Sequence, residues 1–247
     1  MMRTVHSRAH TTWRMVAEAL TRPYPVRWPM VLLVALVPLY LFIPDFALDD
    51  TFHAPELALD RMIPVQPVWS LVYGALYMFL IVLPVLVVRH DEHIRRTVFA
   101  YLTVWLTSYV VFLVYPTVAP RPEVVTGDGF AAWGLRGLYG ADPPYNCFPS
   151  IHVAHSFVSA LTCLRVHRGL GIVSIFCATI VGISTLYTKQ HYVVDVIAGA
   201  LLAIVAYLIF LRRVPREENR IAPALAMLVA GICAVGVGCY WIVYAFS

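Results

Sequence analysis

Long apolar runs separated by short polar connections dominate this chain of 247 residues. A run of about 20 apolar residues is the length that a helix needs to cross the hydrocarbon core of a bilayer. Hydrophobic residues make up 60% of the chain and charged residues only 13%, whereas soluble domains carry about 25% charged residues. The sequence therefore predicts an all-α, polytopic transmembrane helix bundle and argues against a water-soluble protein.

Seven apolar segments are candidates for membrane spans. They are residues 29–46, 68–88, 97–116, 150–166, 170–187, 192–211 and 221–245. Because no Ser/Gly-rich linker separates them, we expect a single membrane domain over residues 29–247. The basic tail before it, residues 1–28, either lies on the bilayer as an interfacial amphipathic helix or serves only to set the topology.

The basic residues are distributed unequally between the two sets of connections. Fourteen of the 18 Lys and Arg residues lie in the tail and in alternate connections, and four lie in the opposite set. Cytoplasmic loops carry the excess of positive charge, so we expect a cytoplasmic N-terminus and a non-cytoplasmic active site, in a bacterial plasma membrane. The arginines lie in short connections rather than on a soluble basic module, which argues against nucleic acid as a partner.

His191 and Asp195 begin the segment 192–211, close to the non-cytoplasmic face. Ionisable groups at membrane depth are costly and therefore indicate function. A spacing of four places both side chains on one face of a helix, where the carboxylate can fix the tautomer of the imidazole and leave its other nitrogen free as a nucleophile. The alternative is a pair that only satisfies itself inside the bundle.

A second polar helix start, Cys147-Phe148-Pro149-Ser150-Ile151-His152, is expected at the same face. Pro149 can begin a helix whose first turn presents unpaired amides, and such a turn suits a phosphate group. Ser150 would add a hydroxyl donor, and His152 could protonate a leaving oxygen as a general acid. The alternative is an ordinary Pro-Ser helix cap that happens to precede a histidine.

Two cations are candidates for phosphate binding at this face. Arg121 follows the end of the segment 97–116, and a guanidinium suits phosphate oxygens. Lys189, the only lysine of the chain, lies two residues before His191. For both residues, contact with anionic lipid headgroups is the alternative.

A metal site formed by His152, His155, His191 and Asp195 is a less favoured hypothesis. Helical metal pairs are usually spaced i, i+4, and here that spacing joins a histidine to an acid. We therefore expect no metal and no other cofactor, and we expect a packing role for His155.

These motifs resemble the type 2 phosphatidic acid phosphatase superfamily, which also includes vanadium haloperoxidases and inositol phosphorylceramide synthases. Its second motif is similar to FPSIH at 148–152, and its third is similar to STLYTKQHYVVDVIAG at 184–199. The resemblance covers roughly residues 68–211. It implies a six-helix catalytic core with one extra span here, a phosphohistidine on His191, orientation by Asp195, a general acid at His152 and no metal requirement.

The chain departs from the motifs of that family in two places. Val114 stands where the first motif has a lysine, so that only Arg121 and Pro122 match it, and Thr185 stands where the third motif has an arginine. Lys189 is a candidate replacement for that arginine. With this arginine missing, the motifs are closer to the inositol phosphorylceramide synthase branch than to the common phosphatases.

The residues and the resemblance together predict an integral-membrane phosphoryl-transfer enzyme. We expect a lipid phosphate phosphatase, or a related phosphotransferase, acting on a lipid phosphate or a prenyl diphosphate among the membrane lipids. The first alternative is a head-group phosphotransferase resembling inositol phosphorylceramide synthase, and an alternative of another class is a non-catalytic transporter or scaffold. The identity of the lipid, the acceptor and the oligomeric state are left open.

Overall fold

Residues 13–21, 23, 25–48 and 51–247 are described by a computed structural model, and the regular structure of this described part is helical. Two isolated β-bridges, His53 with Thr117 and Val118 with Tyr145, join its loops. Five helices are long and apolar enough to cross a membrane: α4 (Val68–Val87), α5 (Asp91–Val114), α8 (Arg168–Tyr187), α9 (Val193–Ala206) with its π-helical extension η2 (Tyr207–Leu211), and α10 (Ala222–Ala245). The prediction of an all-α bundle is therefore confirmed.

The two remaining expected spans form shorter apolar helices, α2 (Arg27–Leu39) and α7 (Ile151–Val166). The expected span 29–46 is interrupted after Leu39, and the short 3-10 helix η1 (Ile43–Phe46) follows. Pro38 and Pro44 flank this break, and a proline lacks the N–H that a continuing helix needs. The count of seven spans stays a prediction.

Helix α5 begins six residues before the expected span 97–116. Asp91 and Glu92 occupy its first turn, where carboxylates interact favourably with the positive end of the helix dipole. Glu92 also pairs with Arg95 and, at 2.7 Å, with Arg96. Hydropathy alone placed the beginning of the span after the charged residues, whereas Asp91 and Glu92 cap a helix that includes them.

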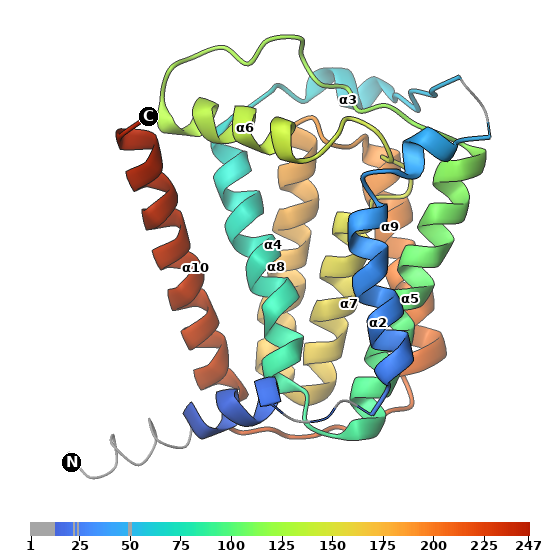
Figure 1. The fold of residues 1–247 in the computed structure, drawn as a ribbon, viewed down its shortest axis with the longest axis vertical. Coiled ribbons are helices and arrows are strands. Elements are labelled where there is room, and N and C mark those ends of the chain that lie inside the picture. The colour runs from blue at the N-terminus through green and yellow to red at the C-terminus, as the bar shows by residue number, and fades with distance from the viewer. Residues whose placement is uncertain (1–12, 22, 24, 49–50) are drawn as a thin grey trace.

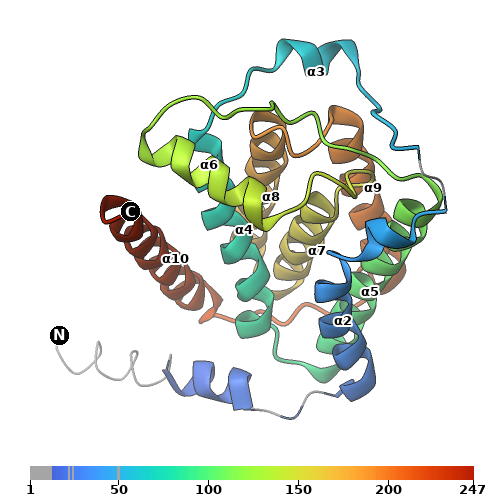
Figure 2. The ribbon, with the colours of Figure 1, turned by 45° about the horizontal axis from the view of Figure 1, so that its top comes forward.

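Helix α7 lies at the centre of the bundle and packs against α4, α5, α8 and α9 (Figures 1 and 2). Helix α10 packs mainly against α4 and stands at the edge of the bundle. The amphipathic helix α6 (Phe130–Ala141) lies across one end, and the short helix α3 (Ala58–Met62) lies over the same end. This end, which also holds the starts of α7 and α9, is called the capped end below.

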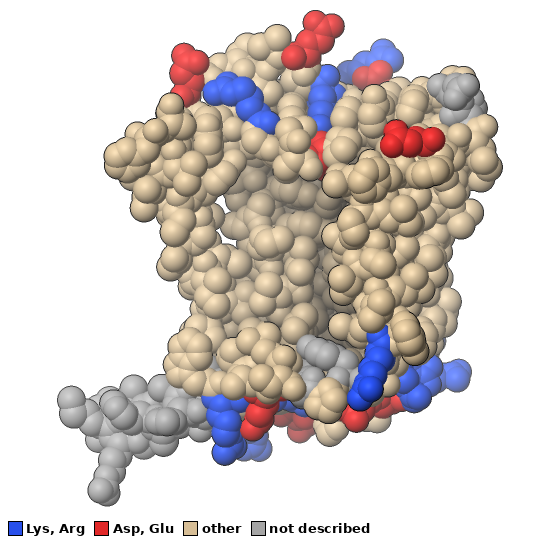
Figure 3. Space-filling model, in the orientation of Figure 1, with Lys and Arg blue, Asp and Glu red and all other residues tan. Residues whose placement is uncertain are grey.

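On the face that Figure 3 shows, charged side chains gather at both ends of the molecule and leave an apolar belt between them. This is the pattern that a bilayer requires, because charges are costly at membrane depth. The end opposite the capped end carries most of the arginines and is called the basic end below. The chain is an integral membrane protein.

Part of the basic tail folds at the basic end. Residues 13–21 are helical, and Glu18 lies 3.4 Å from Arg14 and 3.6 Å from Arg89 at the end of α4. The first part of the predicted tail, residues 1–12, lies outside the described residues. Contact of the tail with the bilayer surface, and the division into a tail of residues 1–28 and one domain of residues 29–247, stay predictions.

A close approach of two backbones brings the starts of α7 and α9 together. The Ser150 N–H donates to the carbonyl of Asp195 at 3.1 Å. A Cβ added at Gly199 would lie 2.5 Å from the Ser150 carbonyl oxygen, which is inside van der Waals contact. Only glycine fits at this position, and its absence of a side chain sets the distance between the two motif-bearing segments.

Candidate active site

His191 and Asp195 meet at the start of α9, but only Asp195 lies on the helix, whereas the prediction placed both residues on it. Helix α9 begins at Val193, so that His191 belongs to the preceding turn. The Asp195 carboxylate accepts a hydrogen bond from the Tyr192 N–H at 2.8 Å, and its Oδ2 lies 3.4 Å from His191 Nδ1. A capping carboxylate thereby faces the imidazole, at a distance that can shorten when the ring becomes charged.

His152, in the first turn of α7, faces the other side of the His191 ring. Its Nδ1 lies 3.2 Å from His191 Nε2, so the two imidazoles and the carboxylate form one row. Three tyrosine rings, Tyr40, Tyr73 and Tyr77, contact His152 edge-on with centroid distances of 5.2–6.3 Å. These three rings restrict the orientation of the His152 imidazole.

Ser150 is the N-cap of α7 and is fully buried. Its Oγ accepts a hydrogen bond from the Val153 N–H at 3.3 Å, as N-cap residues commonly do. The hydroxyl hydrogen stays available as a donor. The expected Pro-Ser helix start is therefore present, and the role of Ser150 in phosphate binding stays a prediction.

Arg121 lies at the capped end and contacts the residue next to His191. Its two terminal nitrogens donate to backbone carbonyls at the end of α6, including that of Asp142 at 2.7 Å, and to the side-chain oxygen of Gln190. The guanidinium also lies 4.5 Å above the Tyr139 ring. Two nearby buried donors, Arg121 Nε and Gln190 Nε2, have no hydrogen-bond partner within the described part of the chain.

Unpaired buried donors are rare in folded proteins and call for a ligand or ordered water. Arg121 donates to the side-chain oxygen of Gln190. The amide nitrogen of Gln190 is then the donor that lacks a hydrogen-bond partner within the described residues. Sequence reasoning missed Gln190, although it directly precedes His191. Its uncharged amide gave no electrostatic signal.

The Lys189 ammonium is hydrogen-bonded to another segment of the chain. Its Nζ donates to the backbone carbonyl of Asp60 at 2.8 Å, in the short helix α3. The buried Asp60 side chain in turn accepts hydrogen bonds from the Leu57 N–H and the Val193 N–H, each at 2.8 Å. Lys189 and Asp60 therefore connect α3 to the start of α9. The binding of phosphate by Lys189 stays a prediction.

The atoms that could hold a metal differ from those of the metal hypothesis. One ligand atom each of Cys147, His191 and Asp195 lie within 4.8 Å of one another. Burial, and next the negative charge of Asp195, raise the pKa of the Cys147 thiol well above its ordinary value, and a protonated thiol is a poor metal ligand. His155 instead packs among the rings of Tyr77, Tyr101 and Trp105, in line with the packing role expected for it.

The row of one carboxylate and two imidazoles, with donors beside it that have no hydrogen-bond partner within the described residues, is suited to binding a phosphate group. The sequence model of the PAP2 superfamily matches residues 51–209, and the chain belongs to this superfamily. The membership is consistent with a phosphoesterase. The resemblance identified from the motifs is thereby confirmed.

One curated relative shows the same relationship. The chain is 26% identical over 120 residues to a PA-phosphatase related-family protein of Dictyostelium discoideum. The aligned region covers 44% of this chain but only 22% of that relative, so the chain spans a small part of the relative's length. No solved structure is significantly similar to the chain.

Proposed function

We propose that this protein transfers the phosphoryl group of a lipid phosphate or prenyl diphosphate through a phosphohistidine on His191, with water as the usual acceptor. The observation that carries the proposal is the row of Asp195, His191 and His152, in which successive side chains lie 3.4 and 3.2 Å apart. Nδ1 of His191 faces the carboxylate, so Nε2 is the nitrogen that attacks phosphorus.

The reaction proceeds in two steps that use the same pair of histidines. His191 Nε2 forms a bond to phosphorus while the bond from phosphorus to the lipid oxygen breaks, and His152 gives its proton to that oxygen. Water then attacks the phosphohistidine, gives a proton to His152 and releases inorganic phosphate. Because the two rings are in direct contact in the free protein, the phosphoryl group must separate them when substrate binds.

Three side chains are suited to bind the phosphoryl oxygens: Ser150 through its hydroxyl, Arg121 through Nε and Gln190 through its amide nitrogen. We propose that Gln190, rather than Lys189, supplies the donor that is lost where Thr185 replaces arginine. Thr185 is buried, and its hydroxyl donates to the Gly182 carbonyl at 2.7 Å. Donors fixed before the reaction stabilise the charge of the transition state without reorganisation.

We also propose that the basic end faces the cytoplasm and the capped end faces the opposite side, in a bacterial plasma membrane. The unequal distribution of Lys and Arg supports this orientation. The phosphoryl group would then be released outside the cytoplasm.

The test is the transfer of phosphorus from radiolabelled phosphatidate to purified protein. The wild-type protein should become labelled and release free phosphate, whereas His191→Ala should do neither, because it lacks the attacking nitrogen. His90→Ala, which removes an exposed histidine at the basic end, is the matched control and should behave as wild type. Labelling of folded His191→Ala would reject His191 as the nucleophile.

The same assay distinguishes water from a lipid alcohol as acceptor. Adding ceramide, whose phosphorylated product differs from phosphatidate, should leave free phosphate as the main product if the protein is a phosphatase. A labelled new lipid in place of free phosphate would instead assign the protein as a head-group phosphotransferase. If the folded protein forms neither product with phosphatidate or with a prenyl diphosphate, the proposed activity is wrong.

A further inference from the structure

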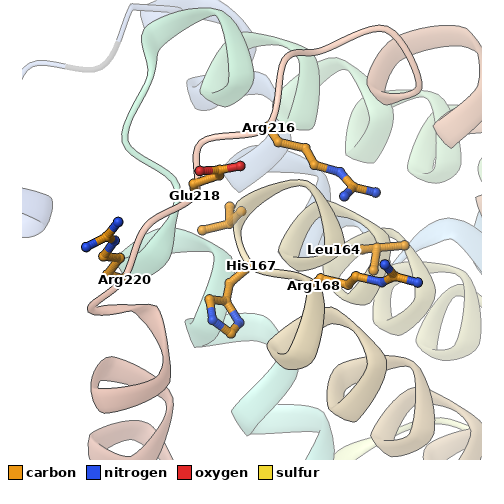
Figure 4. A pocket seen from close by; sticks show the side chains of 7 residues that line it. Leu164, His167, Arg168, Arg216, Glu218 and Arg220 are labelled. Carbon is orange, nitrogen blue, oxygen red and sulfur yellow. The ribbon is translucent and has the colours of Figure 1, made fainter.

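A second charged cavity lies at the basic end, remote from the histidine pair. It has a volume of about 240 Å³ and lies between the turn that joins α7 to α8 and the connection from η2 to α10. Three arginines, Arg168, Arg216 and Arg220, line it together with His167 and Glu218 (Figure 4). Leu164 and Val166 at the end of α7 form its apolar part.

The connection that carries two of these arginines is held firmly in place. Glu217 accepts hydrogen bonds from the Arg89 N–H at 2.8 Å and from the His90 N–H at 3.2 Å, and it pairs with buried His93 at 2.7 Å. Asn219 donates through its side chain to the Val87 carbonyl at 3.1 Å. Residues 217 and 219 thus face the protein, while Arg216, Glu218 and Arg220 alternate with them and are exposed.

The positive charge of the cavity is not neutralised by fixed ion pairs. Within the described residues, Arg168, Arg216 and Arg220 have no ion-pair partner, and Glu218 contributes a single negative charge. Helix α8 also begins here: His167 is its N-cap and accepts from the Leu170 N–H at 3.2 Å. The other amides of this first turn lack helical partners and add to the attraction for an anion.

The size and position of the cavity restrict the kind of anion. Guanidinium groups and a helix start bind phosphate oxygens well. The cavity is smaller than the roughly 300 Å³ or more that is usual for a whole small-molecule ligand, so it suits a headgroup whose acyl chains remain in the bilayer. It lies where the membrane-spanning helix α8 begins at Arg168, which is the depth of lipid headgroups, and basic pockets between spans commonly bind them.

We propose that this cavity binds the phosphate group of an anionic phospholipid from the leaflet at the basic end. The site binds and does not turn over its ligand, because the residues that line it include no imidazole backed by a carboxylate. The bound lipid joins the α7–α8 turn to the connection before α10, and so stabilises the end of the bundle opposite the catalytic row.

The test measures binding of phosphatidylglycerol to the detergent-solubilised full-length protein by native mass spectrometry. Arg168→Gln/Arg216→Gln should weaken the apparent affinity about tenfold or more, since each arginine loses charge-assisted hydrogen bonds. Arg212→Gln/Arg213→Gln removes the same charge from exposed positions outside the cavity. This control should change the affinity by less than about twofold, because exposed charges contribute little. Phosphatidylcholine should bind wild type and both variants equally.

Two results would overturn the proposal. Equal loss of affinity in both double variants would indicate diffuse attraction between charges instead of a built site. Displacement of the lipid by low concentrations of inorganic phosphate or glycerol phosphate would show that the cavity binds a soluble phosphate instead of a lipid headgroup. Phosphatidate turnover by Arg168→Gln/Arg216→Gln should equal that of wild type whether or not the lipid binds, so this test is independent of the proposed catalytic activity.

Discussion

At the scale of single residues, Gln190 is the most informative position of the candidate site. It is buried, its oxygen accepts from Arg121, and its nitrogen lacks a partner within the described residues. An amide held in this way can present only a donor to the neighbouring phosphoryl group. In the mechanism that we propose, it takes the place of the arginine that the third motif lacks.

We expect Gln190→Ala to lower kcat for phosphatidate about a hundredfold, the usual effect of removing one preorganised donor. Gln190→Glu should be at least as damaging, because a carboxylate repels phosphate and binds Arg121 more tightly. Steady-state kinetics on the purified variants provides the measurement. Gln66→Ala is the control, since the Gln66 side chain accepts from the Trp69 indole at the start of α4; unchanged kcat in Gln190→Ala would leave Gln190 a purely structural role.

At the scale of secondary-structure elements, the contact between α7 and α9 creates the site. The Ser150 N–H binds the Asp195 carbonyl, and Gly199 allows the two backbones to touch. The row of three side chains depends on this spacing, because small displacements of reacting groups slow catalysis strongly.

Gly199→Ala should therefore reduce turnover of phosphatidate by about a hundredfold and destabilise the protein by about 1–3 kcal/mol. The added methyl group would separate Ser150 from Asp195 and so move His152 away from His191. Gly231→Ala in α10, where a Cβ meets no atom within 4 Å, should retain activity and stability. Kinetics and thermal unfolding of both variants check the prediction, which fails if Gly199→Ala is as active as Gly231→Ala.

The starts of these two helices were predictable to within one residue, whereas the contacts around them were not. Segments expected from residues 150 and 192 begin as α7 at Ile151 and as α9 at Val193, because Pro149 and the capping Asp195 mark them locally. The direction of the Lys189 side chain depends on Asp60, 129 residues earlier. Helix α6 was missed, since its Gly-rich sequence resembles a loop and its amphipathic face packs against the bundle beneath it.

At the scale of the whole molecule, a buried contact between a histidine and a glutamate joins two segments of the basic end. His93 and Glu217 are 0% and 2% exposed and lie 2.7 Å apart. Burial by itself would raise the pKa of Glu217, but the hydrogen bond and charge of His93 and two backbone N–H groups lower it below the ordinary value. The carboxylate form is therefore the stabilising one, so this contribution is complete above the unfolded pKa of about 4.3 and is lost as the pH falls through the lower folded value.

Glu217→Gln should unfold more easily than wild type at neutral pH, by about 1–3 kcal/mol for hydrogen bonds to a charged group. It should also lose part of the acid sensitivity of wild type below the ordinary carboxyl pKa. Unfolding in detergent across a pH series provides the measurement, with Glu218→Gln, an exposed neighbour, as control. Equal stability of the two variants at neutral pH would show that the pair contributes nothing to folding.

The orientation of the molecule can be tested with cysteine labelling of intact cells. In a variant without the five native cysteines, Arg136→Cys should react with an impermeant maleimide, because α6 lies at the capped end. Arg216→Cys should react only after the membrane is permeabilised. The opposite pattern would reverse the proposed orientation.

The contacts of Arg121 with the end of α6 link the surface of the capped end to the proposed phosphate-binding site. Carbonyls of Tyr139, Asp142 and Pro143 fix the guanidinium, and the Tyr139 hydroxyl donates to the Thr188 carbonyl at 2.7 Å, three residues before His191. Any molecule that shifts this surface helix would also shift the guanidinium and the turn that carries the nucleophile. The rate of the reaction would thus respond to what touches the protein from outside the bilayer, without that molecule entering the site.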